Sequence, residues 1–368
     1  MRRLGTNRRP LGALALAGAI AAPLLAGGVA RADVIPLADM MHGIRMTQQQ
    51  CAATPSTVWV SSALGGFCMR YYLSVAGGDG RWATVFLQGD KLGRGNLRTR
   101  VFSGDPKQKD IDTADLQKVA DAFSRKTKGP AIYLARIGVD GSSGYHIVRH
   151  SVLELEVTNA ALTGIKLLHR YQGFHLVGQS GGATLVGGLL AMRQDIGCAV
   201  PGSGRLAAVT KTRTKSSDLA VSNFEPSDML AMIARNRARI LVVTDPQDHV
   251  VPWQDQAAFV ERLRRAGGQA EQFFVQAIDD EHHGTVAYAG TAVAACIRGD
   301  DNQAIARELA DLVRRRVASA QREKEQRMGQ AAAPQRPQPN AGMPPPQQPA
   351  RTSSAAPLPG HQASMRQQ

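Results

Sequence analysis

Cysteine is scarce in this chain: there are four among 368 residues, and no two of them are spaced as C-x-x-C. That absence excludes the usual dithiol redox motif and the paired-cysteine zinc site. An even number of cysteines instead suits disulfide bonds in an oxidising compartment. Three pairings are possible. The one that we favour joins Cys51 to Cys68 and Cys198 to Cys296, and a Cys68–Cys198 link is an alternative.

Long uninterrupted apolar segments are also lacking, because the stretch from Leu11 to Leu25 is broken by Pro23 and by glycines. It is too short for a comfortable membrane span, so no stable span is expected in the mature chain. A head with four arginines precedes the stretch, and an A-x-A site ends at Ala32. These features predict that residues 1–32 are a cleaved export signal of the general secretory or the twin-arginine type. The mature protein is therefore expected to be periplasmic or extracellular.

Acidic residues are fewer than basic ones, with 30 against 44 and a net charge of +14. Much of the excess lies at the ends, because the signal holds five arginines and residues 321–368 hold six basic against two acidic residues. The rest carries about +5 and has no clustered basic helix, which argues against nucleic acid as a partner. The segment 321–368 is rich in Gln, Pro and Ala, with almost no large aliphatic residues, and is expected to be a disordered tail.

The most informative motif is G-x-S-x-G at residues 178–182, because of its surroundings. A strand-type run over residues 174–177 precedes it, and a small, aliphatic, helix-type run over residues 183–192 follows. Strand, sharp turn and helix make this motif a nucleophile elbow, in which glycines leave space around a strained serine. The turn exposes the Ser180 hydroxyl and aims a helix N-terminus at it, where developing negative charge is favoured.

A nucleophilic serine needs a base and an acid that orients the base, in the chain order Ser, Asp or Glu, His. Two loops that follow buried-strand patterns supply both kinds of residue. The first loop contains Asp245 and Asp248, and the second contains His282 and His283. Open α/β sheets gather their sites in loops at the carboxyl ends of strands, so all four residues are candidates.

In these features the chain resembles the α/β-hydrolase family over about residues 80 to 318. The segment that begins at Asp248 looks like the family's D-x-x-V-P loop, which makes Asp248 the expected triad acid and Asp245 the alternative. His283 precedes a glycine, as the family's catalytic histidine commonly does, so His283 is the expected base and His282 the alternative.

The resemblance also implies an oxyanion hole made of two backbone amides. One is the amide of Gly181, which follows the nucleophile, and the other belongs to Gly89 or Asp90, in the loop after an apolar strand. Relatives often carry His-Gly in this loop. Gln88 departs from that pattern, but the contribution required is only a backbone N–H. Asp90 is harder to explain, because a carboxylate close to an oxyanion is repulsive unless it points away.

The order of elements implies an α/β fold with a doubly wound, mostly parallel sheet. Residues 33–80 are expected to form an extension that adds edge strands, and residues 81–320 to form the catalytic domain. The interval of about forty residues between Cys198 and Arg239 leaves room for only a short cap segment. The run of motifs is similar to that of the catalytic domains of prolyl oligopeptidases and dienelactone hydrolases, and the upstream region is too short for a propeller.

These features predict an exported serine hydrolase that cleaves carboxylic esters through an acyl-enzyme, with Ser180, His283 and Asp248 as its triad. A small-molecule ester is the expected substrate. A short peptide is the alternative substrate for the same chemistry, and a non-catalytic exported binding protein is the alternative from another class. No metal or organic cofactor is implied.

Overall fold

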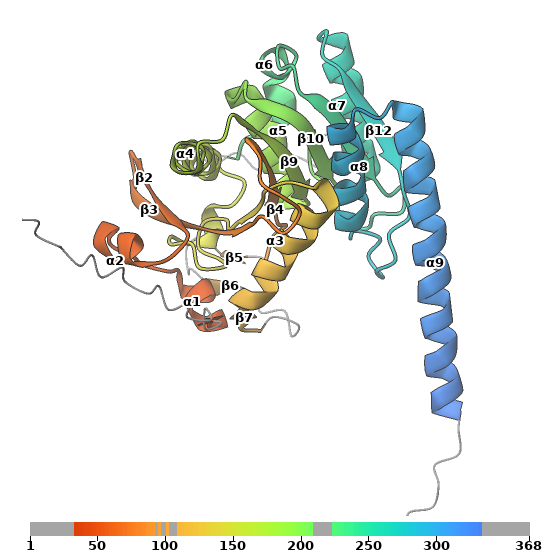
Figure 1. Cartoon of the computed structure of the whole chain (residues 1–368), viewed down its shortest axis with the longest axis horizontal. Coiled ribbons are helices and arrows are strands. Elements are labelled where there is room, and N and C mark those ends of the chain that lie inside the picture. Colours follow the sequence, from red (N-terminus) through yellow and green to blue (C-terminus); the bar gives the residue numbers. More distant parts are fainter. Residues whose placement is uncertain (1–32, 93–94, 97–100, 103–108, 209–222, 333–368) are drawn as a thin grey trace, which may run out of the picture. The chain divides into compact units, whose positions relative to one another are not determined.

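Figure 1 shows a computed structural model of the chain. It describes five stretches, namely residues 33–92, 95–96, 101–102, 109–208 and 223–332. The predicted export signal, positions 209–222 of the predicted cap segment and the Pro-rich part of the predicted tail lie outside the described residues. The chain divides at Ala320 into a large compact unit and a short second one that begins at Gln321.

An eight-stranded sheet forms the centre of the large unit, with the strand order β12-β11-β10-β9-β4-β8-β3-β2. The first six strands of that order run parallel to one another. Their bounds are Ala270–Phe274 (β12), Arg239–Thr244 (β11), Ile196–Gly202 (β10), Gly173–Gln179 (β9), Trp82–Leu87 (β4) and Ala131–Leu134 (β8). Because the strands are parallel, their carboxyl ends and the loops that follow them meet along one edge of the sheet.

The parallel strands have the continuous apolar sequences expected of a sheet that is covered on both faces. In β11, the four residues from Ile240 to Val243 are all almost completely buried. The apolar strand pattern before Gln88 and the buried-strand pattern before Asp245 form β4 and β11.

The segment before β4 adds two antiparallel strands at one edge of the sheet, β2 (Thr57–Ser62) and β3 (Gly65–Ser74). β3 pairs antiparallel with β8, which attaches the hairpin to the parallel strands. The prediction of N-terminal edge strands is thereby confirmed. Two further sheets have two short strands each, and they pair Val34–Ile35 (β1) with Ile111–Asp112 (β7) and Gly95–Asn96 (β5) with Val101–Phe102 (β6).

Helices cover both faces of the sheet (Figure 1), and each face has its own hydrophobic core. The first face carries α4 (Val152–His169), α5 (Gly181–Met192), α6 (Leu230–Ile233) and α7 (Trp253–Arg265). The second carries α3 (Thr113–Thr127), α8 (Val286–Arg298) and the first part of α9 (Asn302–Ala332). Shorter elements are α1 (Leu37–His42), α2 (Gln48–Ala53) and the 3-10 turns η1 (His146–Val148) and η3 (Pro226–Asp228).

The strand order, the helices on both faces and the sharp turn between β9 and α5 make this an α/β-hydrolase fold. The doubly wound, mostly parallel sheet that the resemblance implied is therefore confirmed. Six parallel strands deliver their loops to the same edge, so residues far apart in the sequence can meet there.

Both favoured disulfides are present. Cys51 in α2 is bonded to Cys68 in β3, and Cys198 in β10 is bonded to Cys296 in α8. The first bond ties the N-terminal extension to the edge of the sheet. The second ties a central strand to the helix on its second face.

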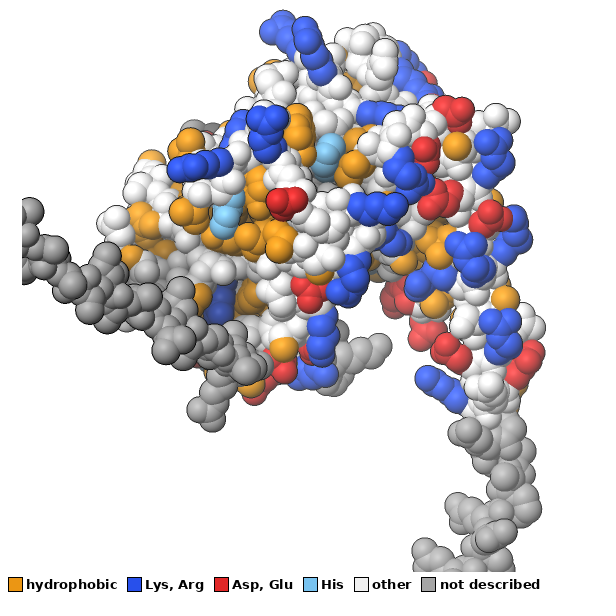
Figure 2. Space-filling model, in the orientation of Figure 1, with side chains coloured by type: hydrophobic (Ala, Val, Ile, Leu, Met, Phe, Trp, Pro, Cys, Tyr) orange, Lys and Arg blue, Asp and Glu red, His pale blue; other side chains and the backbone are white. Residues whose placement is uncertain are grey.

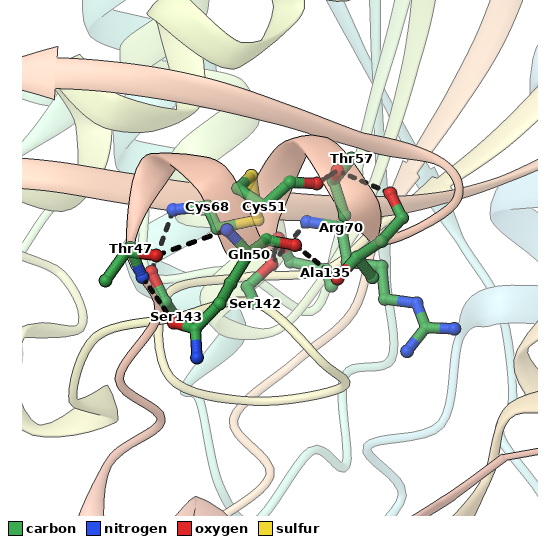
Figure 3. The surroundings of a disulfide bond; sticks show 10 residues. Thr47, Gln50, Cys51, Thr57, Cys68, Arg70, Ala135, Ser142 and Ser143 are labelled. Carbon is green, nitrogen blue, oxygen red and sulfur yellow. Dashed lines mark hydrogen bonds between the residues drawn. A yellow bond between two sulfur atoms is a disulfide. The ribbon is translucent and has the colours of Figure 1, made fainter.

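Two serines beside the first disulfide have a structural function (Figure 3). Ser143 Oγ accepts a hydrogen bond from the Cys68 N–H at 2.8 Å. Ser142 Oγ accepts from the Arg70 N–H at 2.9 Å and donates to the Ala135 carbonyl at 3.1 Å. These bonds attach the glycine- and serine-rich loop after β8 to strand β3.

The last helix, α9, continues to Ala332, so the first residues of the predicted tail, from Gln321 onward, are helical. This stretch is helical because, apart from Gly329, it consists of Gln, Arg, Glu, Lys, Met and Ala, which are strong helix formers. Proline begins only at Pro334.

In the stretches that the structure describes, no helix is long and apolar enough to cross a membrane. On the face shown in Figure 2, Lys and Arg side chains alternate with Asp and Glu around α7, α8 and β12. Hydrophobic side chains gather around α4 and β4 on the same face. The mixture of positive and negative side chains around α7, α8 and β12 differs from the stripe of positive charge that is typical of nucleic-acid interfaces.

We expect replacement of Cys198 and Cys296 by alanine to lower the free energy of unfolding by roughly 4 to 5 kcal/mol, because that bond closes the longer loop. The sequence separation is 98 residues for this bond and 17 for Cys51–Cys68. Replacing Cys51 and Cys68 by alanine should lower the free energy of unfolding by roughly 3 kcal/mol. Both variants should still fold, since a domain of this size buries enough apolar surface without bridges. Denaturant unfolding measures both losses, and a larger loss for Cys51–Cys68 would contradict the expectation.

Candidate active site

The turn between β9 and α5 holds Ser180 in a strained conformation. Its φ is +54°, in the left-handed region that is costly for a residue with a side chain. The Ser180 N–H donates to the Gly202 carbonyl at 2.9 Å, so the neighbouring strand β10 helps to hold the turn. Ser180 is also the N-cap residue of α5, which puts the positive end of the helix dipole beside it.

The glycines of the motif are required by close backbone contacts around Ser180. A Cβ on Gly182 would lie 2.0 Å from the carbonyl oxygen of Leu87, at the end of β4. A Cβ on Gly178 would lie 2.4 Å from the carbonyl oxygen of Gly182. The end of β4, the turn and the start of α5 therefore approach one another more closely than a side chain at these positions permits.

The loop after β4 lies directly beside the serine. A Cβ on Gly89 would lie 3.0 Å from Ser180 Cβ and 3.7 Å from Ser180 Oγ. Gly181 follows the serine and begins α5. The amides predicted to form an oxyanion hole thus belong to two segments that adjoin Ser180, and their role stays a prediction.

The structure brings Asp248 and His283 together. His283 Nδ1 lies 3.0 and 2.9 Å from the two carboxylate oxygens of Asp248. Because a carboxylate only accepts, Nδ1 carries the proton and Nε2 is the acceptor of a neutral imidazole. The Asp248 side chain is buried, and its Oδ1 also accepts from the N–H groups of Val250 and Val251. The loop that supplies the carboxylate therefore also fixes its orientation.

Gln179, the residue before the serine, connects the elbow with the histidine loop. Its Nε2 donates to the His283 carbonyl at 2.7 Å, and its Oε1 accepts from the N–H and hydroxyl of Thr285 at 3.1 and 2.9 Å. The backbone of His283 is thereby held next to the elbow. The Ser180 hydroxyl itself forms no hydrogen bond with the residues that the structure describes. Catalytic hydrogen bonds often tighten only when substrate is bound.

The two alternatives, Asp245 and His282, also pair with each other. His282 Nδ1 lies 3.1 Å from Asp245 Oδ2, and the same oxygen accepts from the Ala277 N–H at 2.7 Å. The other oxygen accepts from the Gln247 N–H at 2.8 Å, and Asp245 is buried. This second pair links the loop after β11 to the segment after β12, so it fixes the two loops that also carry the first pair.

A further carboxylate holds the backbone of His283. Asp279 accepts from the N–H groups of His283 and Gly284 at 3.0 and 2.8 Å. Burial alone would raise the pKa of Asp279, but these two donors hold it below its ordinary value, so the group stays ionised at neutral pH. His283 is thus fixed by one carboxylate at its ring and by another at its backbone.

The Asp90 carboxylate points into a cluster of basic side chains. Its Oδ1 accepts from Arg136 Nη1 at 2.8 Å, and its Oδ2 accepts from His150 Nε2 at 2.9 Å and forms an ion pair with Arg149 Nε at 3.0 Å. Burial alone would raise the pKa of Asp90, but His150 and Arg136 hold it well below its ordinary value. The negative charge is therefore compensated locally, which answers the objection to a carboxylate beside an oxyanion hole.

Arg136 lies at the centre of this cluster and is almost completely buried. Its Nε and Nη2 donate to the two oxygens of Glu154 in α4, at 2.8 and 3.0 Å, and its Nη1 also donates to the Gln88 carbonyl at 3.3 Å. Burial alone would raise the pKa of Glu154, but the guanidinium holds it below its ordinary value. Arg136 thus anchors the loop after β4 to α4.

Sequence reasoning missed the roles of Arg136, His150, Glu154 and Gln179. Arg136 gave a weak signal, because a charged residue directly after a buried strand is seldom buried unless it is paired. Glu154 and His150 gave none, because their contacts join residues 18 and 60 positions apart.

The arrangement is suited to acyl transfer. It combines a strained serine at a helix N-terminus, an imidazole oriented by a carboxylate, and adjoining backbone amides.

Among the described side chains, no group of three or more His, Cys, Asp or Glu residues could hold a metal ion.

The sequence significantly matches neither a protein-family model nor a curated protein. Similar solved structures include the Pyrococcus furiosus esterase Pf2001, at 14% identity and a TM-score of 0.47, over 69% of this chain and 96% of that one. Est1E from Butyrivibrio proteoclasticus, with ferulic acid bound, matches at 12% identity and a TM-score of 0.45, over 66% of this chain and 98% of that one. The Pyrococcus horikoshii acylaminoacyl peptidase matches at 12% identity and a TM-score of 0.43, over 67% of this chain and 40% of that one. Since these TM-scores are below 0.5, the fold assignment rests on the strand order and the elbow.

We expect Gly182→Ala to lower the free energy of unfolding by about 1 to 3 kcal/mol or more, because the added methyl group must push α5 away from β4. Gly129→Ala is the matched control, since a Cβ there meets nothing within 4 Å. The control should change stability by less than about 0.5 kcal/mol. Thermal or denaturant unfolding compares the variants, and equal stabilities would show that the elbow is looser than the structure indicates.

Proposed function

We propose that this protein is an exported serine hydrolase that cleaves carboxylic esters through a covalent acyl-enzyme. The observation that carries the proposal is the Asp248–His283 pair, which Gln179 ties to the strained turn of Ser180. A base oriented in this way beside a strained serine is the arrangement that nucleophilic catalysis requires. Export is proposed from the signal-type N-terminus and is supported by two disulfides.

In the proposed mechanism, Ser180 attacks the ester carbonyl while His283 Nε2 takes the hydroxyl proton. Asp248 keeps the imidazole in the tautomer that leaves Nε2 free and stabilises the imidazolium that forms. The amides of Gly181 and of the Gly89–Asp90 loop donate to the oxyanion. His283 then protonates the leaving alcohol. In the second half of the reaction His283 takes a proton from water, the water attacks the acyl-enzyme, and the proton returns to the Ser180 oxygen as the acid leaves.

Esters are the proposed substrates because the chain between β10 and β11 is too short to form a large cap over the site. Peptides remain the alternative for the same chemistry. A panel of p-nitrophenyl esters of rising acyl length, assayed beside proline and alanine anilides, separates the two. Turnover of esters supports the proposal, and turnover of anilides without esters would replace it with a peptidase.

Ser180→Ala is expected to reduce ester turnover by on the order of 10⁴-fold or more with the fold intact, because only the oxyanion hole and substrate binding are left. His283→Ala should lose about as much, since the serine then lacks its base. His282→Ala is the matched control and should lose far less. Steady-state kinetics and circular dichroism test the three variants. Inactivation by His282→Ala alone would move the base by one residue.

Asp248→Asn should reduce kcat by roughly 10³- to 10⁴-fold, because the amide favours the wrong imidazole tautomer. Asp245→Asn should have a mild effect on kcat, since Asp245 bonds His282 and backbone amides and does not touch His283. The comparison of kcat in the two variants measures this. If Asp245→Asn proved the more damaging to kcat, Asp245 would be the triad acid.

A further inference from the structure

Hydrogen bonds hold both the backbone and the ring of His150. Its N–H donates to Glu154 Oε2 at 2.7 Å, its carbonyl accepts from the Phe224 N–H at 3.1 Å, and its Nε2 donates to Asp90. Its φ of +63° is a left-handed conformation that is strained for histidine. Strain of this kind persists where the surroundings enforce it, and it is frequent at functional sites.

One polar atom of this side chain has no partner. His150 Nδ1 forms no hydrogen bond with any residue in the described part of the chain. The side chain is 23% exposed, and that of Asp90 is 30% exposed. Both side chains are therefore partly open to solvent.

The free atom lies beside the predicted oxyanion hole. His150 Cε1, which is bonded to Nδ1, is 2.9 Å from the position that a Cβ on Gly181 would occupy. Asp90 Oδ1 is 2.3 Å from the same position. If the Gly181 amide binds the carbonyl oxygen of an acyl group on Ser180, as the proposed oxyanion hole requires, substituents next to that carbonyl lie on the side of these two atoms.

Arg136 Nη1 lies 2.7 Å from the same Cβ position, but it already donates to Asp90 Oδ1 and to the Gln88 carbonyl. The groups left for a substrate are therefore hydrogen-bond acceptors. The Asp90 carboxylate can only accept, so in the neutral form of His150 the proton lies on Nε2 and Nδ1 presents a lone pair. Asp90 accepts hydrogen bonds from Arg136 and His150 and forms an ion pair with Arg149, so a carboxylate with about four acceptor sites can take a further donor.

We propose that His150 and Asp90 form a substrate subsite for an acyl group that carries a hydrogen-bond donor, such as a hydroxyl, on the carbon next to the scissile carbonyl. The subsite rests on the proposed function, because a group beside Gly181 meets the acyl chain only if Ser180 is acylated. A hydroxyl donates to His150 Nδ1, whereas a methoxy group at the same carbon cannot donate and leaves the acceptors unpaired.

The first test compares kcat/KM for p-nitrophenyl 2-hydroxybutyrate and 2-methoxybutyrate at pH 8, where imidazoles are normally neutral. We expect about a tenfold preference for the hydroxy ester, the size of one hydrogen bond at a partly exposed site. His150→Phe keeps a ring but removes the acceptor, and should bring the ratio close to one. The ratio cancels any loss common to both esters. His42→Phe, at an exposed position of α1, is the matched control and should keep the preference.

The second test measures binding without turnover. Dissociation constants of 2-hydroxybutyramide and 2-methoxybutyramide are determined by NMR titration of the Ser180→Ala protein and of the same protein with His150→Phe. We expect the first protein to prefer the hydroxy amide by about tenfold and the second to show no preference. Preferential binding without ester turnover in the wild type would refute the hydrolase and keep the subsite. Ester turnover without a hydroxyl preference, or a preference that survives His150→Phe, would overturn the subsite and keep the hydrolase.

Discussion

The close approach of β4, the serine turn and α5 is the constraint on which the rest of the site depends. No side chain fits at Gly178 or Gly182, because backbone oxygens lie 2.4 and 2.0 Å from where each Cβ would be. This approach forces Ser180 into its left-handed conformation, and it brings the Gly89 loop alongside the hydroxyl. The same contact therefore creates the strained serine and sets the place of the amides proposed to stabilise an oxyanion.

The remaining parts are attached to this turn by polar side chains. Gln179 connects it to the His283 loop, and the two Asp–His pairs connect that loop to the one after β11. On the other side, Arg136 joins the loop after β4 to Glu154 in α4. Removing one partner of the buried Arg136–Glu154 pair is expected to cost about 3 to 5 kcal/mol, because the other charge would stay buried without a partner.

Local signals in the sequence predicted the strands and the elbow, because each leaves a pattern within a few residues. The continuous apolar run of β11 and the glycines around Ser180 are such patterns. The disulfide pairing leaves no such pattern, since its partners are 17 and 98 positions apart. The sequence could narrow the acid and base only to Asp245 or Asp248 and His282 or His283, and the structure groups these four residues into two separate pairs. The partners of Asp90 could not be predicted, because Arg136 and His150 reach it from 46 and 60 positions away.

The most direct test of the account is to ask whether Ser180 reacts as an activated nucleophile. The folded mature protein is treated with a fluorophosphonate probe beside a general serine hydrolase, and the labelled residue is located by peptide mapping. The account predicts one label, on Ser180, that is lost in His283→Ala. An intact protein that never labels while the reference enzyme does, or a label on another serine, would contradict it and favour a non-catalytic binding protein or a different nucleophile.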